Sequence, residues 1–358
     1  MQPFNIEIFD TSFNLVQHYN SGVIEYDFDY LSTVENSVLI AFDENVQKGD
    51  YIRIMNSADN YFGYITAIQV NEKVQGFSEI RFKPFISLFD AQILFDTTLQ
   101  GSQTSLEDAI AGYIRAYWIN NSDSSQNIFG LQVETISSTL GWGFHITSDQ
   151  KGLNKAIINF MSSIIRRSLT KYQVGLYVEP NVQTKTITVK VGIKDYSTFY
   201  IEADLPNVIE KSIVLNENTK DTNKLVIYDQ ADLATNITYY KHPDGSYDTS
   251  NTNRIIPVIY AITSVTAVEG ETFADAAEDA ANKQFDTDSF NNLIELTVQN
   301  DDGLVQPETL SIGQLVNIIT NGTSYGSILT GIERSEKTKL IFGTIRLDLT
   351  KILKGGGI

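Results

Sequence analysis

The sequence contains no cysteine, and this absence narrows its chemistry at once. Without thiols the chain forms no disulfide, uses no thiolate nucleophile and holds no cysteine-ligated zinc. Histidine is almost as scarce, because only His18, His145 and His242 occur, and they lie far apart in the chain. A histidine-based metal centre needs more of these side chains or closer spacing. We therefore expect no metal and no cofactor.

Long apolar runs are also missing. No stretch of about 18 uncharged apolar residues exists, so no helical membrane anchor is expected. The N-terminus, MQPFNIEIFD, carries acidic residues where a secretory signal needs a basic and then an apolar stretch. We expect a protein that is made in the cytoplasm without such a signal.

Acidic side chains outnumber basic ones, which gives a net charge of −18 and a pI near 4.5. A surface of this sign repels nucleic acid, so stable binding of DNA or RNA is not expected. The excess is uneven, because residues 151–212 carry more basic than acidic side chains whereas residues 1–150 are strongly acidic. At 358 residues the chain is long enough for two or three domains. The change from an acidic to a basic balance of side chains near residue 150 marks one candidate boundary.

Short β-branched and aromatic runs, separated by turn residues, fill the first hundred residues. They are Ser37–Phe42, Tyr51–Ile54, Tyr61–Val70 and Glu79–Phe85. Strands at this spacing are typical of a small antiparallel barrel or sandwich, which we place at residues 1–98.

Helical patterns follow this barrel. A capping hydroxyl followed by two acidic residues predicts a helix that ends near Ile119, and an apolar stripe predicts a second helix over about Leu153–Lys171. A hairpin is expected next, from the runs Val174–Val178 and Thr184–Val191. We therefore place an α+β domain at residues 99–211.

The strand pattern then resumes. The candidate strands are Lys224–Tyr228, Asn236–Tyr240, Ile255–Val268, Asn292–Val298, Gln314–Ile319, Ser327–Glu333 and Lys339–Leu347. A capped, alanine-rich helix over Thr272–Phe285 interrupts them, which indicates an insertion. We expect a second barrel at residues 212–358 with an insertion at about 230–290. The predicted fold class is α+β, mainly β, with two small β-barrel domains flanking an α+β domain.

One motif suggests an enzyme. The segment Gly322–Gly326 matches GxSxG, the nucleophile elbow of α/β-hydrolases, which sets a serine on a turn from strand to helix. Here an apolar strand pattern follows the segment and no histidine comes after it, so a hairpin turn is the better interpretation. Acidic clusters such as Asp244–Asp248 and Asp286–Asp288 lack the spacing of an EF-hand loop. We predict that the chain is not an enzyme.

The closing stretch Ile328–Ile358 joins two alternating apolar runs across a charged turn and ends in a basic, glycine-rich tail. Together with the runs Gly49–Ile54 and Phe62–Thr66 and the passage Phe82–Asp90, it resembles phage tail baseplate hub proteins. These include the tail-associated proteins of Gram-positive siphophages. The resemblance covers the whole chain in order, as barrel, α+β domain, and barrel with an insertion.

This resemblance implies a structural virion protein at the tail tip or baseplate. In that family three subunits, each with two alike barrels, form a trimeric ring of six barrels that docks on the distal tail protein ring and closes the tail tube. The implied partners also include the tape-measure protein C-terminus and tail fibre or receptor-binding components, with DNA as transient cargo. Arg346, Lys351 and Lys354 are candidates for contact with a neighbouring subunit, and exposed strand and terminus charges are the alternative.

Many members of that family continue into a C-terminal peptidase or receptor-binding region. This chain stops at Lys354-Gly355-Gly356-Gly357-Ile358, so we expect the hub portion without that peptidase. The glycine tail is either a natural end or the start of a linker. Two other classes remain open: the hub of a phage-tail-like bacteriocin, and an unrelated β-rich carbohydrate-binding module, which would be monomeric.

Overall fold

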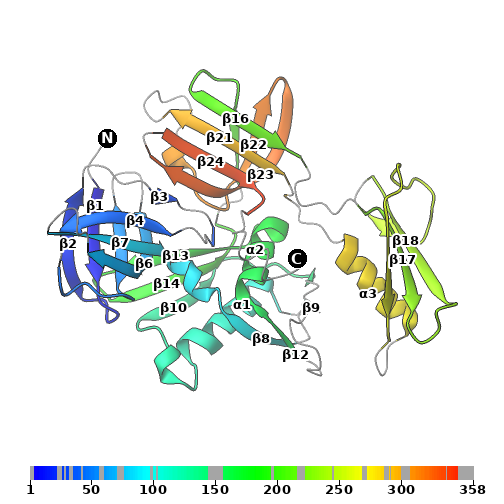
Figure 1. Cartoon of the computed structure of the whole chain (residues 1–358), viewed down its shortest axis with the longest axis horizontal. Coiled ribbons are helices and arrows are strands. Elements are labelled where there is room, and N and C mark those ends of the chain that lie inside the picture. The colour runs from blue at the N-terminus through cyan, green and yellow to red at the C-terminus, as the bar shows by residue number, and fades with distance from the viewer. Residues whose placement is uncertain are drawn as a thin grey trace.

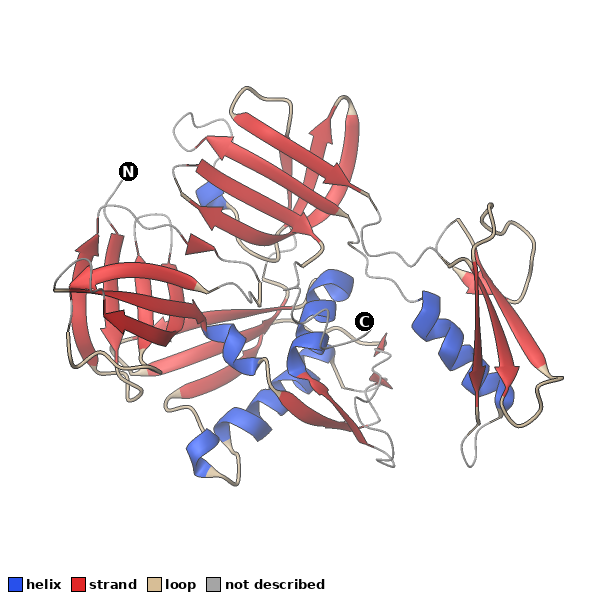
Figure 2. Cartoon of the chain, in the orientation of Figure 1, coloured by secondary structure: helices blue, strands red, loops and turns tan. Residues whose placement is uncertain are grey.

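A computed structural model of the chain shows a mainly β, α+β protein with two curled, barrel-like sheets beside a mixed layer of helices and strands (Figures 1 and 2). This architecture confirms the predicted fold class. The structure describes residues 4–21, 26–27, 30–31, 35–41, 43–55, 60–70, 76–96, 100–101, 104–143, 156–194, 197–215, 222–243, 246–267, 272–285, 290, 292–299, 307–335 and 337–345. The exact domain boundaries stay predictions.

The first barrel is a six-stranded antiparallel sheet in the order β2-β1-β5-β6-β7-β4. Its strands are β1 (Phe4–Phe9), β2 (Leu15–Ser21), β4 (Asn36–Ala41), β5 (Tyr51–Met55), β6 (Asn60–Val70) and β7 (Phe77–Pro84). Buried and exposed positions alternate along β4 and β7, so Val38, Ile40, Ile80 and Phe82 pack inside the barrel. The four strand runs predicted here are confirmed over their described residues, except that Phe85 already belongs to the short helix η1.

The mixed layer follows the first barrel. Its elements are η1 (Phe85–Phe89), β8 (Gln92–Asp96), β9 (Gln100–Gly101), α1 (Leu106–Ile114), η2 (Arg115–Ile119), η3 (Ser124–Gln126), β10 (Leu131–Thr135), β11 (Trp142–Gly143), β12 (Ala156–Phe160), α2 (Met161–Tyr172), β13 (Gly175–Asn181) and β14 (Thr186–Gly192). The predicted start of the first helix is confirmed, because Ser105 Oγ accepts a hydrogen bond from the Asp108 N–H at 3.1 Å. Helical turns continue to Ile119, and β13 and β14 form the predicted hairpin.

The second helix is shorter than its apolar pattern predicts. The prediction of a helix over Leu153–Lys171 is wrong for residues 156–160, which form β12 and pair antiparallel with β8. Helix α2 begins only at Met161. A short isoleucine-rich run suits a strand as well as a helix, so the available partner strand decides its conformation.

The second barrel is a sheet in the order β15-β22-β23-β24-β21-β16. Its strands are β15 (Thr198–Glu202), β16 (Val208–Val214), β21 (Leu293–Gln299), β22 (Leu315–Thr320), β23 (Thr323–Arg334) and β24 (Lys337–Gly343), with the short helix η4 (Pro307–Thr309) before β22. β15 runs parallel to β22, and the other neighbours are antiparallel.

An insertion leaves this barrel between β16 and β21. It consists of β17 (Lys224–Asp229), β18 (Asn236–Lys241), β19 (Tyr247–Asp248), β20 (Tyr260–Val265) and α3 (Phe273–Phe285). Leu225 and Ile227 of its sheet pack with Ala277, Ala281 and Phe285 of α3 in a separate core. The unit stands apart on the right of Figure 1. A helix-containing insertion in the second barrel is thus confirmed.

One residue, Tyr30, ties the two barrels and the mixed layer together. It follows β3 (Tyr26–Asp27), a short strand that pairs with the end of β23, and it is only 2% exposed. Its N–H donates to the carbonyl oxygen of Thr330 in β23 at 2.8 Å, and its hydroxyl accepts from the Leu176 N–H of β13 at 3.0 Å. A segment from the N-terminal part of the chain is therefore bonded to both other parts.

Asp204 binds the turn between β22 and β23 in the second barrel. Asn321 and Gly322 form this turn with positive φ angles of 48° and 74°, the left-handed pair that a two-residue hairpin requires. The Asp204 carboxylate accepts from the Asn321 N–H at 2.6 Å and from the Thr320 hydroxyl at 2.7 Å, and it pairs with Lys211. The hydrogen bond from Lys211, followed by the other two, lowers the pKa of Asp204 to about 2.

We predict that Tyr30→Phe lowers the free energy of unfolding by about 1–3 kcal/mol, because it leaves the buried Leu176 N–H without its acceptor. Urea denaturation followed by circular dichroism measures the change. Tyr260→Phe alters a ring of the insertion that is 64% exposed and is the control, with an expected change below about 0.5 kcal/mol. Equal effects of the two substitutions would contradict the role assigned to Tyr30.

The contribution of Asp204 to stability depends on pH in a defined direction. Its folded-state pKa of about 2 lies below the ordinary value of about 3.9, so the contribution is complete above the ordinary value and is lost as the pH falls through about 2. We predict that Asp204→Asn destabilises the chain at pH 7 and that its difference from the unsubstituted chain shrinks below about pH 4. Urea midpoints at pH 7, 5 and 3 test this, with Glu202→Gln as the control. A difference that is the same at pH 7 and pH 3 contradicts the prediction.

Candidate functional site

The residues predicted to contact a neighbouring subunit are not placed by the structure. Arg346, Lys351 and Lys354 all lie outside the described residues, so their contacts stay predictions. A candidate functional site must therefore be sought among the described residues.

The GxSxG segment forms a hairpin, as predicted. Gly322 occupies the turn, and Ser324 lies exposed in β23 opposite Ile319 of β22. The chain continues as a strand to Arg334. The turn from strand to helix that presents a hydrolase nucleophile is therefore not formed at Ser324.

Titratable side chains do not gather into a metal site in the part of the chain that the structure describes. Groups of three or more histidine, cysteine, aspartate or glutamate side chains are absent there. His242 Nε2 lies 3.0 Å from Asp248 Oδ1 on the insertion, while Asp244 and the cluster Asp286–Asp288 fall outside the described residues. Among the described helices, none has the length and apolar character needed to cross a membrane.

The two barrels repeat one four-stranded motif. The order is β5-β6-β7-β4 in the first barrel and β22-β23-β24-β21 in the second, with every pair antiparallel. In both, the strand that comes first in the chain lies last among the four. A bulge falls at the same place, between Ile65 and Ala67 in β6 and between Leu329 and Gly331 in β23. The two barrels are therefore built on the same four-stranded motif.

A glycine opens each repeat and forms what we call its glycine corner. Gly49 has a φ of 98° and donates its N–H to Ile65 O at 2.9 Å, while Gly313 has a φ of 86° and donates to Leu329 O at 2.8 Å. Ile65 and Leu329 return a hydrogen bond to the carbonyl of the residue after the glycine, at 2.8 and 2.9 Å. The left-handed backbone at both corners favours glycine over residues that carry a Cβ.

The sequence contains a weak signal of this repeat, which composition and strand periodicity do not reveal. Residues 49–54 read GDYIRI and residues 313–318 read GQLVNI. Only the glycine and the last isoleucine are identical, and the positions between them agree in polar or apolar character. Such a pattern is weak alone, and the matching hydrogen bonds are what identify it.

Exposed apolar side chains lie at the edges of both barrels. On the first barrel, Leu39 of the edge strand β4 and Phe77 of β7 lie on the outer face, 47% and 40% exposed. On the second barrel, Val214 of the edge strand β16 is 39% exposed, and Tyr200 of the opposite edge strand β15 is 70% exposed. We call these four residues the edge surface. Open sheet edges with exposed apolar residues are typical of protein-binding surfaces.

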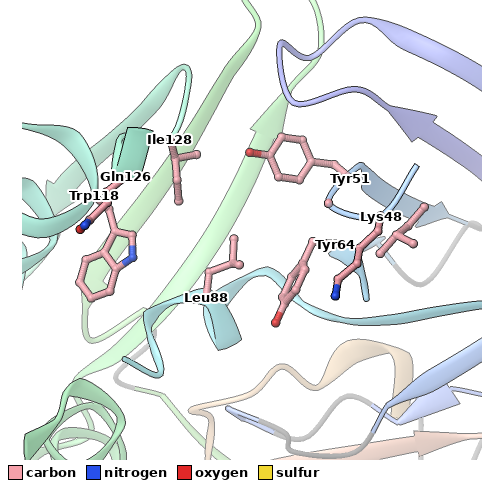
Figure 3. Close-up of a pocket in the computed structure, with 9 residues that line it drawn as sticks. Lys48, Tyr51, Tyr64, Leu88, Trp118, Gln126 and Ile128 are labelled. Atoms are coloured by element: carbon pink, nitrogen blue, oxygen red, sulfur yellow. The ribbon is translucent and has the colours of Figure 1, made fainter. Parts of the chain in front are cut away.

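A cavity of about 380 Å³ lies between the first glycine corner and the mixed layer. Figure 3 shows Tyr51 and Tyr64 from the barrel on one side and Trp118 and Ile128 on the other, with Leu88 between them. The lining is completed by Lys48, Gly49, Ile65 and Gln126. Burial raises the pKa of Tyr51 to about 12, so its hydroxyl stays neutral at ordinary pH. The mostly aromatic and aliphatic walls suit an uncharged, ring-shaped group.

Comparison with known proteins gives a match in structure alone. No protein-family model matches the chain, and no curated protein matches it. A chain of the phage P2 baseplate in its activated conformation with Ca aligns with a TM-score of 0.54 at 11% identity, covering 95% of this chain and 98% of that chain. The 43 kDa tail protein of prophage MuSo2 from Shewanella oneidensis aligns with a TM-score of 0.54 at 15% identity, covering 96% and 98%. The tail protein from Neisseria meningitidis MC58 gives 0.51 at 12% identity, covering 96% and 97%.

These alignments extend over nearly the whole length of every chain compared. At identities this low they establish the fold. The chain therefore has the fold of phage baseplate and tail proteins, which confirms the resemblance predicted from its sequence.

Proposed function

We propose that the chain is a structural protein of a phage tail and that three copies form a hub which closes the tail tube at the baseplate or tail tip. The observation that carries this proposal is the repeat of one barrel motif within a chain of the phage tail protein fold. Three copies of a chain with two equivalent barrels present six equivalent units around one axis. Such a ring is suited to a tube of six-fold symmetry.

The edge surface supports a ring in which barrels meet edge to edge. A closed head-to-tail ring joins two different surfaces of the same chain. Leu39 and Phe77 supply such a surface on the first barrel, and Val214 on β16 and Tyr200 on β15 supply exposed apolar positions at the two sheet edges of the second barrel. Covering them removes exposed apolar area from water, which favours association. Arg346, Lys351 and Lys354 are proposed to add contacts at the same subunit boundary.

The proposed partners follow from a position at the end of the tail. One face of the ring docks on the distal tail protein ring, the channel receives the C-terminus of the tape-measure protein, and the periphery carries tail fibre or receptor-binding components. DNA passes through the open hub as transient cargo. The net charge of −18 disfavours stable DNA binding, because like charges release no counterions on contact. We assign the chain no catalytic role.

We predict that the chain assembles with a mass of about three times 40.0 kDa. Multi-angle light scattering at several protein concentrations measures this mass directly. A monomer at every concentration would contradict a hub that assembles from this chain alone, and it would favour the carbohydrate-binding alternative, which glycan binding then tests.

Substitutions at the edge surface are expected to break the assembly. Leu39→Asp and Val214→Asp each place a charge in the proposed contact, and burial of an unpaired charge there is costly. Each variant should dissociate at a concentration at which the unsubstituted chain is a trimer. Leu233→Asp alters a leucine of the insertion that is 68% exposed and is the matched control. Trimers of normal stability in both edge variants would show that the barrels meet elsewhere.

A further inference from the structure

The two glycine corners have the same backbone but different surroundings. A Cβ added at Gly313 would collide with the hydroxyl of Tyr177 and would meet Leu169 Cδ1 at 3.5 Å. In addition, Gln173 Nε2 donates to Gly313 O at 3.4 Å. The mixed layer of the same chain therefore fills the space beside the second corner, where the hydroxyl end of the Tyr177 side chain comes closest to the glycine.

The first corner is open. A Cβ added at Gly49 would meet no heavy atom within 4 Å. The space beside it is the cavity of about 380 Å³ between Tyr51 and Tyr64 of the barrel and Trp118 and Ile128 of the mixed layer (Figure 3). The chain thus leaves a cavity at the position where its own second barrel receives a tyrosine.

The walls of this cavity fit one more aromatic ring. Tyr51, Tyr64 and Trp118 offer faces and edges against which a ring packs in offset or edge-on geometry. Lys48 is exposed at the mouth, where its ammonium group can approach the ring or hydroxyl of an incoming side chain. At the equivalent corner this space is taken by the phenol group of Tyr177, which makes a tyrosine side chain the occupant to consider for the first corner.

We propose that the cavity beside Gly49 receives the ring of Tyr200 from a second copy of the chain. This inference rests on the proposed ring, in which the second barrel of one copy lies beside the first barrel of the next. Tyr200 is 70% exposed on the edge strand β15 of the second barrel, while its neighbour Ile201 is buried and holds the strand in place. An exposed ring on a fixed edge strand would thus enter a cavity that lies between the first barrel and the mixed layer of the adjoining copy and is lined by three aromatic side chains.

Competition with p-cresol, which is the tyrosine side chain alone, tests the occupant. Tyr200→Ala empties the cavity, so calorimetry should show saturable binding of p-cresol to this variant. The unsubstituted assembly should bind p-cresol at least about tenfold more weakly, because its cavity is already occupied. Lys48→Phe in the Tyr200→Ala background fills the cavity from its mouth and should abolish the binding. Glu44→Phe places the same ring in the same loop but outside the cavity and should leave the binding unchanged.

Self-association provides the second measurement. Tyr200→Ala should weaken assembly at least about tenfold, whereas Tyr200→Phe keeps the ring and should stay within about twofold of the unsubstituted chain. Tyr260→Ala removes a ring that is 64% exposed on the insertion and is the matched control.

The outcomes separate this inference from the proposed hub. If trimers form but p-cresol does not bind the Tyr200→Ala variant, or binds it and the unsubstituted trimer equally, the second-copy occupant is overturned and the hub stands. If the unsubstituted chain stays monomeric and binds p-cresol as well as the variant does, the trimeric hub fails. The cavity then accepts a phenol, but the occupant is not Tyr200 of a second copy.

Discussion

The buried hydrogen bonds of Tyr30 fix the arrangement on which the rest of the structure depends. One hydrophobic core runs from Phe9 and Phe13 of the first barrel through Leu106 and Leu169 of the mixed layer to Phe342 of the second barrel. Tyr30 lies within this core and bonds to strands on two of its sides. A tyrosine hydroxyl in apolar surroundings needs a partner, so the bond to β13 sets the position of the ring as well as its burial. Together with the apolar packing of this core, these bonds hold the segment after β3 against the second barrel and the mixed layer.

The two barrels share a central four-stranded motif but differ in the strands that flank it. The shared strand order, bulge and glycine corner would let two parts of one chain take corresponding places in the proposed ring. The flanking strands differ, since β1 is antiparallel to β5 whereas β15 is parallel to β22. The two barrels therefore differ in their flanking strands, so the proposed ring of alternating barrels would have a defined direction.

Local features of the fold could be predicted from the sequence because they depend on residues that are close together in the chain. Ser105 as a helix cap and Asn321–Gly322 as a hairpin turn are examples in which the side chain or the absence of a Cβ decides the backbone. The strand at residues 156–160 was not accessible, because its conformation depends on β8, a partner about sixty residues earlier in the chain.

The candidate site was harder to predict than the fold. Exposure of Leu39, Val214 and Tyr200 depends on which strands become sheet edges, and a single sequence does not state the strand order. The cavity beside Gly49 arises where two distant segments, one with Tyr64 and one with Trp118, fail to fill the space between them. Charge patterns near the C-terminus led to Arg346, Lys351 and Lys354, which the described residues do not include.

The separate core of the insertion has a consequence for how such a chain can diversify. Leu225, Ile227, Ala277, Ala281 and Phe285 pack among themselves, and the strands that border the insertion, β16 and β21, pair directly with each other. The barrel closes its own sheet whether or not the inserted unit keeps its sequence. Mutations can therefore accumulate on the insertion, or one inserted unit can replace another by recombination, while the barrel sheet keeps its packing.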